Sequence, residues 1–231
     1  MHRIQRISMI KVTALLPMKG NSERVKDKNM KNFAGFPLYH AIVKSLLGSK
    51  YIEHIIIDTD SERIAQDAKN HFNDKVIIVD RPKEIQGDFV SMNEIIAYDL
   101  TQVEGEIFLQ THSTNPLLKV ETIDSAIEKY LASIETFDSV FGVTKVQTRF
   151  YDQQANPINH NPKELLRTQD LEPYYEENSN LYIFSKTSFI QAENRRIGLR
   201  PQIFEINKLE AIDIDEPEDF TLATLLYTHN R

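Results

Sequence analysis

The chain has 231 residues, no cysteine and a formal net charge of −7. Its length suits one sizeable core, and a composition of 41% hydrophobic and 26% charged residues argues against intrinsic disorder. The acidic balance argues against a general nucleic-acid binder, the lack of cysteine excludes thiolate metal sites, and no apolar run is long enough for a bilayer. We expect a cytoplasmic protein without nucleic-acid or membrane partners.

Apolar segments with strand and helix periodicity alternate along most of the chain. We predict strands over 9–16, 54–58, 75–79, 106–110, 139–146 and 180–186, helices over 38–47, 62–71, 91–100 and 120–133, and a strand, an acidic turn and a closing helix within 204–227. This alternation is typical of βαβ units in a three-layer, mainly parallel, Rossmann-like α/β sheet. Ligands of such sheets bind beyond the carboxyl ends of the strands.

The segment 149–177 interrupts this alternation. It is rich in Gln, Asn, Pro and Tyr and shows little periodicity. A connection of this length is unusual within a compact domain. We therefore predict one domain over 1–231 that carries 149–177 as an arm or partner contact.

A basic loop follows the first predicted strand. Gly20, Asn21 and Ser22 allow backbone N–H groups to turn toward an anion, and the neighbouring lysines can neutralise phosphate oxygens. The loop matches neither the P-loop nor the dinucleotide fingerprint. A solvated basic surface is the alternative interpretation of the same residues.

Two Asp-x-Asp pairs follow predicted strands. Asp213 and Asp215 lie in an extended segment, where alternation puts both carboxylates on one face and allows them to share Mg²⁺. The alternative is that Asp215 caps the closing helix. For Asp58 and Asp60 we favour a structural role, because Asp60 or Ser61 directly precedes a helix.

The seven histidines lack zinc-site spacing, and no nucleophile-elbow motif is present. His112 is the one histidine at a predicted strand end. We regard His112 as a minor candidate for a site residue.

Several motifs together resemble the cytidylyltransferases that activate acylneuraminate-type sugar acids, including synthetases of CMP-sialic acid and CMP-Kdo. The loop "KGNSERVKDKN" is similar to the family's triphosphate loop, and "LQTHSTNP", "LRTQDLEPYYEENSNLYI" and "DIDEPEDF" are similar to later family motifs. The shorter matches are Asp58 to Asp60, Arg81 with Pro82, and Asp88 with Ser91. The resemblance covers nearly the whole chain and makes metal binding by Asp213 and Asp215 the preferred interpretation.

The resemblance implies a nucleotidyltransferase fold and transfer of CMP from CTP to the anomeric hydroxyl of a nonulosonic, sialic acid-like sugar acid, with release of pyrophosphate. It implies a homodimer, with 149–177 as the dimerisation arm, and Mg²⁺ as cofactor. The implied catalytic residues are Lys19, Lys28 and Asp213, and the implied metal ligands are Asp213 and Asp215. The implied nucleotide-binding residues are Lys19, Gly20, Asn21, Ser22, Lys28, Asn29, Arg81, Asp88 and Ser91, and the acceptor residues are Gln110, Gln169, Asn178 and Tyr182.

The sequence departs from the family pattern at two places. Lys19 stands where Arg is usual, which keeps the charge and loses bidentate phosphate geometry. The segment "THSTNP" is two residues longer than the family's "PTSP", and Leu118 and Lys119 stand where an Arg usually follows. Two alternative functions are activation of a phosphonate or another acid, and metal-dependent glycosyl transfer from a nucleotide-sugar.

Overall fold

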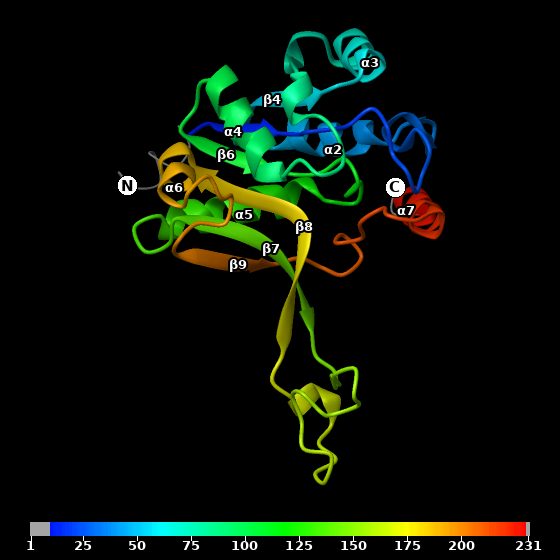
Figure 1. The fold of residues 1–231 in the computed structure, drawn as a ribbon, viewed down its shortest axis with the longest axis vertical. Coiled ribbons are helices and arrows are strands. Elements are labelled where there is room, and N and C mark those ends of the chain that lie inside the picture. Colours follow the sequence, from blue (N-terminus) through cyan, green and yellow to red (C-terminus); the bar gives the residue numbers. More distant parts are fainter. Residues whose placement is uncertain (1–9, 230–231) are drawn as a thin grey trace.

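The computed structural model describes residues 10–229 and is built around one seven-stranded sheet with the order β5-β4-β1-β6-β8-β7-β9 (Figure 1). The strands pair in parallel except for β8, which is antiparallel to both of its neighbours. The strands are β1 (Val12–Leu15), β4 (Ile52–Thr59), β5 (Val76–Asp80), β6 (Ile107–Gln110), β7 (Ser139–Val146), β8 (Tyr174–Ser185) and β9 (Pro201–Glu205). The expectation of a mainly parallel α/β sheet is confirmed.

Helices cover both faces of the sheet because successive strand residues point to opposite sides. One core cluster packs β1 and β4 against α2 (Tyr39–Gly48), α3 (Glu62–Phe72) and α5 (Val120–Ser133). The opposite cluster packs β6 and β8 against α4 (Met92–Gln102) and α6 (Lys186–Gln191). None of the helices within 10–229 is both long and apolar enough to cross a membrane.

A third, smaller cluster lies at the carboxyl end of β1. Val25 of the basic loop packs there with Ile214 and Phe220, the latter from α7 (Pro217–His229). A short hairpin of β2 (Asn32–Phe33) and β3 (Phe36–Pro37) completes this cluster. It joins the first loop of the chain to its closing helix.

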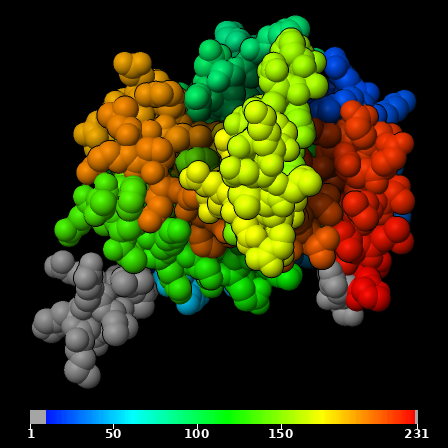
Figure 2. Space-filling model, turned by 90° about the horizontal axis from the view of Figure 1, so that it is seen from below, coloured from blue at the N-terminus to red at the C-terminus, as the bar shows by residue number. Residues whose placement is uncertain are grey.

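The arm leaves the sheet where β7 and β8 extend beyond their neighbours (Figure 1). The pairing register shifts between Phe141 and Val143, and Ser179 on the opposing strand has φ of 57°. Such an irregularity bends a strand pair and increases its twist. Figure 2, viewed along the arm, shows it standing out from the body between α7 and the segment around α6.

The predicted helices agree with α2, α3, α4 and α5, and the strand predicted over 139–146 agrees with β7. The largest difference is at β8, which begins at Tyr174, six residues before the predicted strand. Its first four residues, Tyr174 to Glu177, are exposed, so the apolar pattern of a buried strand is missing there. The start of the strand predicted over 9–16 lies outside the described residues.

Candidate functional site

The candidate site lies at the edge of the sheet where four parallel strands end. The basic loop follows β1, Asp60 follows β4, Arg81 follows β5, and Gln110 is the last residue of β6. Leu15 of β1 is paired with Gln110 of β6, and the Thr111 N–H donates to the Leu15 carbonyl at 3.1 Å. The start of the basic loop is therefore adjacent to Gln110.

The structure brings the basic loop to the distant Asp-x-Asp segment. Lys28 Nζ donates to the Ile214 carbonyl at 2.5 Å and lies 3.9 Å from Asp215 Oδ1. Arg24 Nη2 lies 2.6 Å from the same Asp215 oxygen. Burial lowers the pKa of Lys28, and the charges of Asp215 and Asp213 oppose that shift. The two motifs form one site, with the Val25 and Ile214 contact beneath it.

The tip of the loop is held by two further carboxylates. Lys19 forms an ion pair with Asp88, which lowers the pKa of that carboxyl. The Gly20 N–H donates to Asp60 Oδ1 at 2.5 Å. A Cβ on Gly20 would lie 2.7 Å from Ser61 Cβ, so only glycine permits this approach. After it, Asn21 is exposed and Ser22 is half-buried.

The side chains of Asn29 and Ser91 form hydrogen bonds within the protein and do not present free hydrogen-bonding groups to the basic loop. The Asn29 amide donates to the Lys19 carbonyl at 3.0 Å and accepts from the Ser113 hydroxyl at 2.6 Å. Ser91 caps α4 by accepting from the Asn93 N–H. Both residues hold the backbone of the predicted nucleotide site.

Arg81 lies beneath the site in a buried group with Asp58 and Asp99. Arg81 Nε donates to Asp58 Oδ1 at 2.5 Å, and Nη2 lies 3.5 Å from the Met18 carbonyl. Both Asp99 oxygens and Asp58 Oδ2 are buried without a hydrogen-bond partner in the described residues. Burial, followed by the charge of Asp58, raises the pKa of Asp99, which favours a proton shared between the two carboxyls. Arg81 therefore positions the strand ends.

The other Asp-x-Asp pair does not present two free carboxylates. Asp58 is fully buried and Asp60 accepts from Gly20. Ser61 caps α3 by accepting from the Ile64 N–H, as the capping interpretation predicts.

Asp213 carries a buried carboxylate oxygen that no described residue engages. Its Oδ1 is buried without a hydrogen-bond partner among the described residues, and burial raises its pKa. Asp215 is paired with Arg24 and does not cap α7; Asp219 instead accepts from the Asp215 and Glu216 N–H groups at 3.1 and 2.8 Å. No group of three or more metal-binding side chains occurs within 10–229. The two aspartates fit Mg²⁺ whose other ligands are phosphate oxygens and water.

The predicted acceptor residues separate into two sets. Gln110 and Tyr182 are paired on β6 and β8, and both side chains contact Arg196. Asn178 is used internally, donating to Thr144 Oγ1 and accepting from the Asn180 N–H. Gln169 lies in η4 (Thr168–Asp170) on the arm, which projects away from β6 and the rest of the sheet (Figure 1).

Sequence reasoning missed Arg196 and Asp99. Asp99 follows the buried Ile95 by one helical turn, and this spacing on an apolar face is a signal that could have identified it. Arg196 lies in an irregular segment between α6 and β9 and carries no comparable local signal. His112 has a lowered pKa because of burial and then the charge of Arg196.

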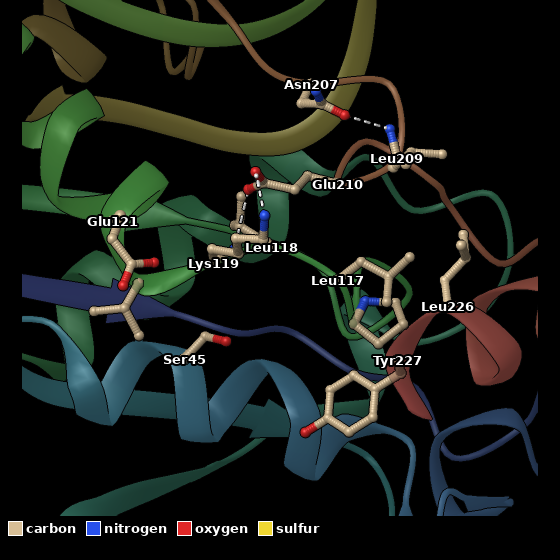
Figure 3. Close-up of a pocket in the computed structure, with 12 residues that line it drawn as sticks. Ser45, Leu117, Leu118, Lys119, Glu121, Asn207, Leu209, Glu210, Leu226 and Tyr227 are labelled. Atoms are coloured by element: carbon tan, nitrogen blue, oxygen red, sulfur yellow. Dashed lines mark hydrogen bonds and ion pairs between the residues drawn. The ribbon is translucent and has the colours of Figure 1, made fainter. Parts of the chain in front are cut away.

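A separate cavity of about 580 Å³ lies between α2, α5 and α7 (Figure 3). Lys119 lines it, with its Nζ 3.5 Å from Glu210 Oε1, while Leu118 is buried in the core. None of the predicted site residues lines this cavity. Of the two residues that replace the usual arginine, Lys119 is thus paired with Glu210 and Leu118 is packed in the core.

A mainly parallel α/β sheet with a basic loop at its strand ends, and paired aspartates from the segment before α7 beside that loop, defines a nucleotide-binding class of enzyme. The chain belongs to the cytidylyltransferase family, whose model matches residues 13–230.

Relatives with stated activities cover almost the whole chain. It is 24% identical to the pseudaminic acid cytidylyltransferase of Campylobacter jejuni, over 96% of this chain and 98% of that protein. It is 27% identical to the CMP-N,N'-diacetyllegionaminic acid synthase of Legionella pneumophila, with the same coverage of 96% and 98%. The fold is similar to that of CMP:2-keto-3-deoxy-manno-octonic acid synthetase complexed with CTP, with a TM-score of 0.70, 13% identity, and coverage of 96% and 100%.

Proposed function

We propose that this cytidylyltransferase transfers CMP from CTP to the anomeric hydroxyl of a nonulosonic 2-keto sugar acid and releases pyrophosphate. The observation that carries the proposal is the contact between the basic loop and the Asp213 to Asp215 segment, beside Gln110 at the next strand end. The relatives that act on pseudaminic and legionaminic acids support this substrate class.

In this reaction the hydroxyl oxygen attacks the α-phosphorus in line and gives its proton to solvent water, while the bond from the α-phosphorus to the pyrophosphate oxygen breaks and pyrophosphate leaves. Positioning and charge neutralisation supply most of the catalysis of phosphoryl-type transfers. Lys19 and Lys28 neutralise the triphosphate as charge develops on it. Gly20, Asn21 and Ser22 offer backbone N–H groups to the same oxygens.

Binding of the triphosphate requires the loop cations to exchange partners. Lys19 is paired with Asp88, and Arg24 with Asp215 and Glu216, all through partly exposed side chains. Exposed ion pairs contribute little, typically about 0 to 1 kcal/mol each. Phosphate oxygens can therefore replace these carboxylates at small cost, which frees Asp215 for a cation.

We assign Mg²⁺ to Asp213 and Asp215. When bound there, the ion would neutralise negative charge on the phosphate oxygens. The partnerless Asp213 oxygen supports this assignment. Asp58 and Asp60, already engaged with Arg81 and Gly20, provide no second metal pair of the kind a glycosyltransferase would need in mid-domain.

We also propose that the protein is a cytoplasmic homodimer whose arm reaches the partner's site. The arm carries exposed apolar side chains, including Leu165 at 88% and Ile158 at 57% exposure. Exposed apolar groups gathered on one segment are typical of protein contacts. Contact with a partner would also explain why Gln169 lies far from Gln110 of its own chain.

The proposal is tested by pyrophosphate release from CTP and Mg²⁺ with a panel of nonulosonic acids, Kdo and aminoalkylphosphonates. We expect turnover with at least one nonulosonic acid, and a CMP-sugar as product. Turnover confined to phosphonates would contradict the substrate class. Hydrolysis of a nucleotide-sugar without pyrophosphate release would contradict the reaction itself.

A further inference from the structure

Arg196 is a cation that three elements hold beside Gln110. Its Nη1 donates to Gln110 Oε1 at 2.7 Å, and its guanidinium lies 3.7 Å from the centre of the Tyr182 ring. Its backbone N–H donates to Asn93 Oδ1 at 3.3 Å, which ties the segment to α4. The side chain is only 18% exposed, so its position is determined by packing.

The hydrogen bonds of His112 show how this group is oriented. His112 Nε2 lies 3.1 Å from Gln110 Nε2 and 3.4 Å from Arg196 Nη1, and both of those nitrogens are donors. The Gln110 amide also donates to the Thr111 carbonyl at 2.8 Å, which fixes which end of the amide carries the nitrogen. His112 Nε2 is therefore the acceptor, and the ring is neutral. His112 holds Gln110 and Arg196 without neutralising the guanidinium.

The charge of Arg196 is only weakly compensated. Glu177 Oε1 lies 3.9 Å from Nη2, and the same oxygen accepts the Tyr182 hydroxyl. Within the described part of the chain, Nε and Nη2 have no acceptor at hydrogen-bond distance. A partly buried guanidinium with free donors favours a bidentate anion such as a carboxylate.

Other basic residues near the acceptor segment are engaged elsewhere. Lys119 pairs with Glu210 beside the separate cavity (Figure 3). Lys19 of the basic loop pairs with Asp88. Gln110 instead contacts Arg196, which comes from a segment 86 residues later in the chain. Arg196 therefore supplies the positive charge next to Gln110.

We infer that Arg196 binds the carboxylate of the acceptor, with Gln110 and Tyr182 holding its guanidinium in place. The inference rests on the proposed function and identifies the residue that selects an acid as acceptor. In a 2-keto sugar acid the carboxylate is attached to the anomeric carbon. Binding it at Arg196 places the attacking hydroxyl beside Gln110, on the strand next to β1 and its loop.

The test compares Arg196→Gln with Arg195→Gln, which makes the same charge change at an exposed neighbour whose one hydrogen bond within residues 10–229 goes to the Ala192 carbonyl. For the acid found in the panel assay, we expect KM to rise about 10- to 100-fold in Arg196→Gln, with KM for CTP unchanged. Arg196→Lys should recover only part of the loss, because lysine keeps the charge but cannot donate two parallel hydrogen bonds to one carboxylate. Equal acceptor KM values in Arg196→Gln and Arg195→Gln would overturn the inference.

A second measurement needs no variant. The wild-type enzyme should prefer the acid to its primary carboxamide by a similar factor, because the carboxamide has no charge to offer Arg196. Equal use of acid and carboxamide would overturn the inference and leave cytidylyl transfer intact. A wild-type enzyme that releases no pyrophosphate with any acid in the panel would overturn the proposed function together with this inference.

Discussion

Asp99 shows how a single buried carboxyl couples the site to pH. It faces Asp58 and Arg81, and Asp60 adds a further negative charge near Asp58. Folding raises the pKa of Asp99 above its ordinary value of 3.8, first through burial and then through the charge of Asp58. The folded protein thus holds a proton that the unfolded chain releases, and stability falls as pH rises from about 4 toward that raised pKa.

We predict that Asp99→Asn becomes more stable relative to the wild type as pH rises. Asparagine keeps an N–H donor for Asp58 Oδ2 but does not titrate. One titrating group changes the free energy of unfolding by at most about 1.4 kcal/mol per pH unit. Urea unfolding between about pH 6 and pH 9 measures the difference. A constant stability difference over this range would contradict the shared-proton arrangement.

Asp213 is predicted to govern the magnesium requirement. Asp213→Asn should raise the Mg²⁺ concentration needed for half-maximal rate by at least about 10- to 100-fold. Loss of a residue that only hydrogen-bonds to a metal ligand already weakens metal binding by this factor. Unfolding stability should be little changed, because Oδ1 has no hydrogen bond to lose in the described structure. The rate is measured against Mg²⁺ at saturating CTP.

The matched control for Asp213 is Glu218→Gln, an exposed carboxylate in the first turn of α7. It removes the same charge from the same end of the chain. If both variants require the same concentration of Mg²⁺, the assignment of the metal to Asp213 is wrong.

At the scale of the element, the basic loop depends on contacts with the other end of the chain. Lys28 is half-buried against the Ile214 carbonyl, whereas Lys26, two residues earlier, is exposed. Val25, the residue before Lys26, points into the cluster with Ile214. The loop thus alternates between residues that anchor it and residues that face solvent.

We predict that Lys28→Ala lowers kcat about 100- to 1000-fold, because it removes a charge that neutralises the triphosphate in the transition state. Lys26→Ala, with the same loss of charge, should stay near the wild-type rate. Pyrophosphate release at saturating substrates measures both, and thermal unfolding shows whether Lys28→Ala is folded. Equal rates in the two variants would show that only the net charge of the loop matters.

At the scale of the whole molecule, the arm is an extension that the chain does not cover itself. Leu165 and Leu166, 88% and 50% exposed, belong to the arm that projects from the sheet (Figure 1). Burial of apolar area between two chains would stabilise this segment at about 25 cal/mol per Å².

We predict a solution mass of twice the 26.8 kDa chain, and a shift to monomer in Leu165→Glu/Leu166→Glu. A buried carboxylate without a partner is strongly unfavourable in an interface. Light scattering at micromolar concentration measures the mass. Ile77→Glu, at an exposed position on β5, is the control and should remain dimeric. A wild-type monomer would contradict the assembly.

Most of the elements could be predicted because their signals are local. Periodicity identified 120–133 and 139–146 with the bounds of α5 and β7, since the 3.6- and 2-residue repeats are set by neighbouring residues. Residue type and position also indicated the basic loop and the pair of Asp213 and Asp215, and the family resemblance then made metal binding the preferred interpretation of that pair. The start of β8 was missed because its exposed residues leave no apolar pattern.

The sequence by itself determined the alternation of strands and helices, and which charged residues stand at strand ends. Only the tertiary structure decided that Asn29 and Arg81 are held by internal contacts, and that Arg196 meets Gln110 across 86 residues. The contact between Arg196 and Gln110 depends on the position of β8 between β6 and β7, and on the segment after α6, which folds back over β8. Strand order is set by the packing of the whole sheet, so no local pattern reveals which distant side chains it brings together.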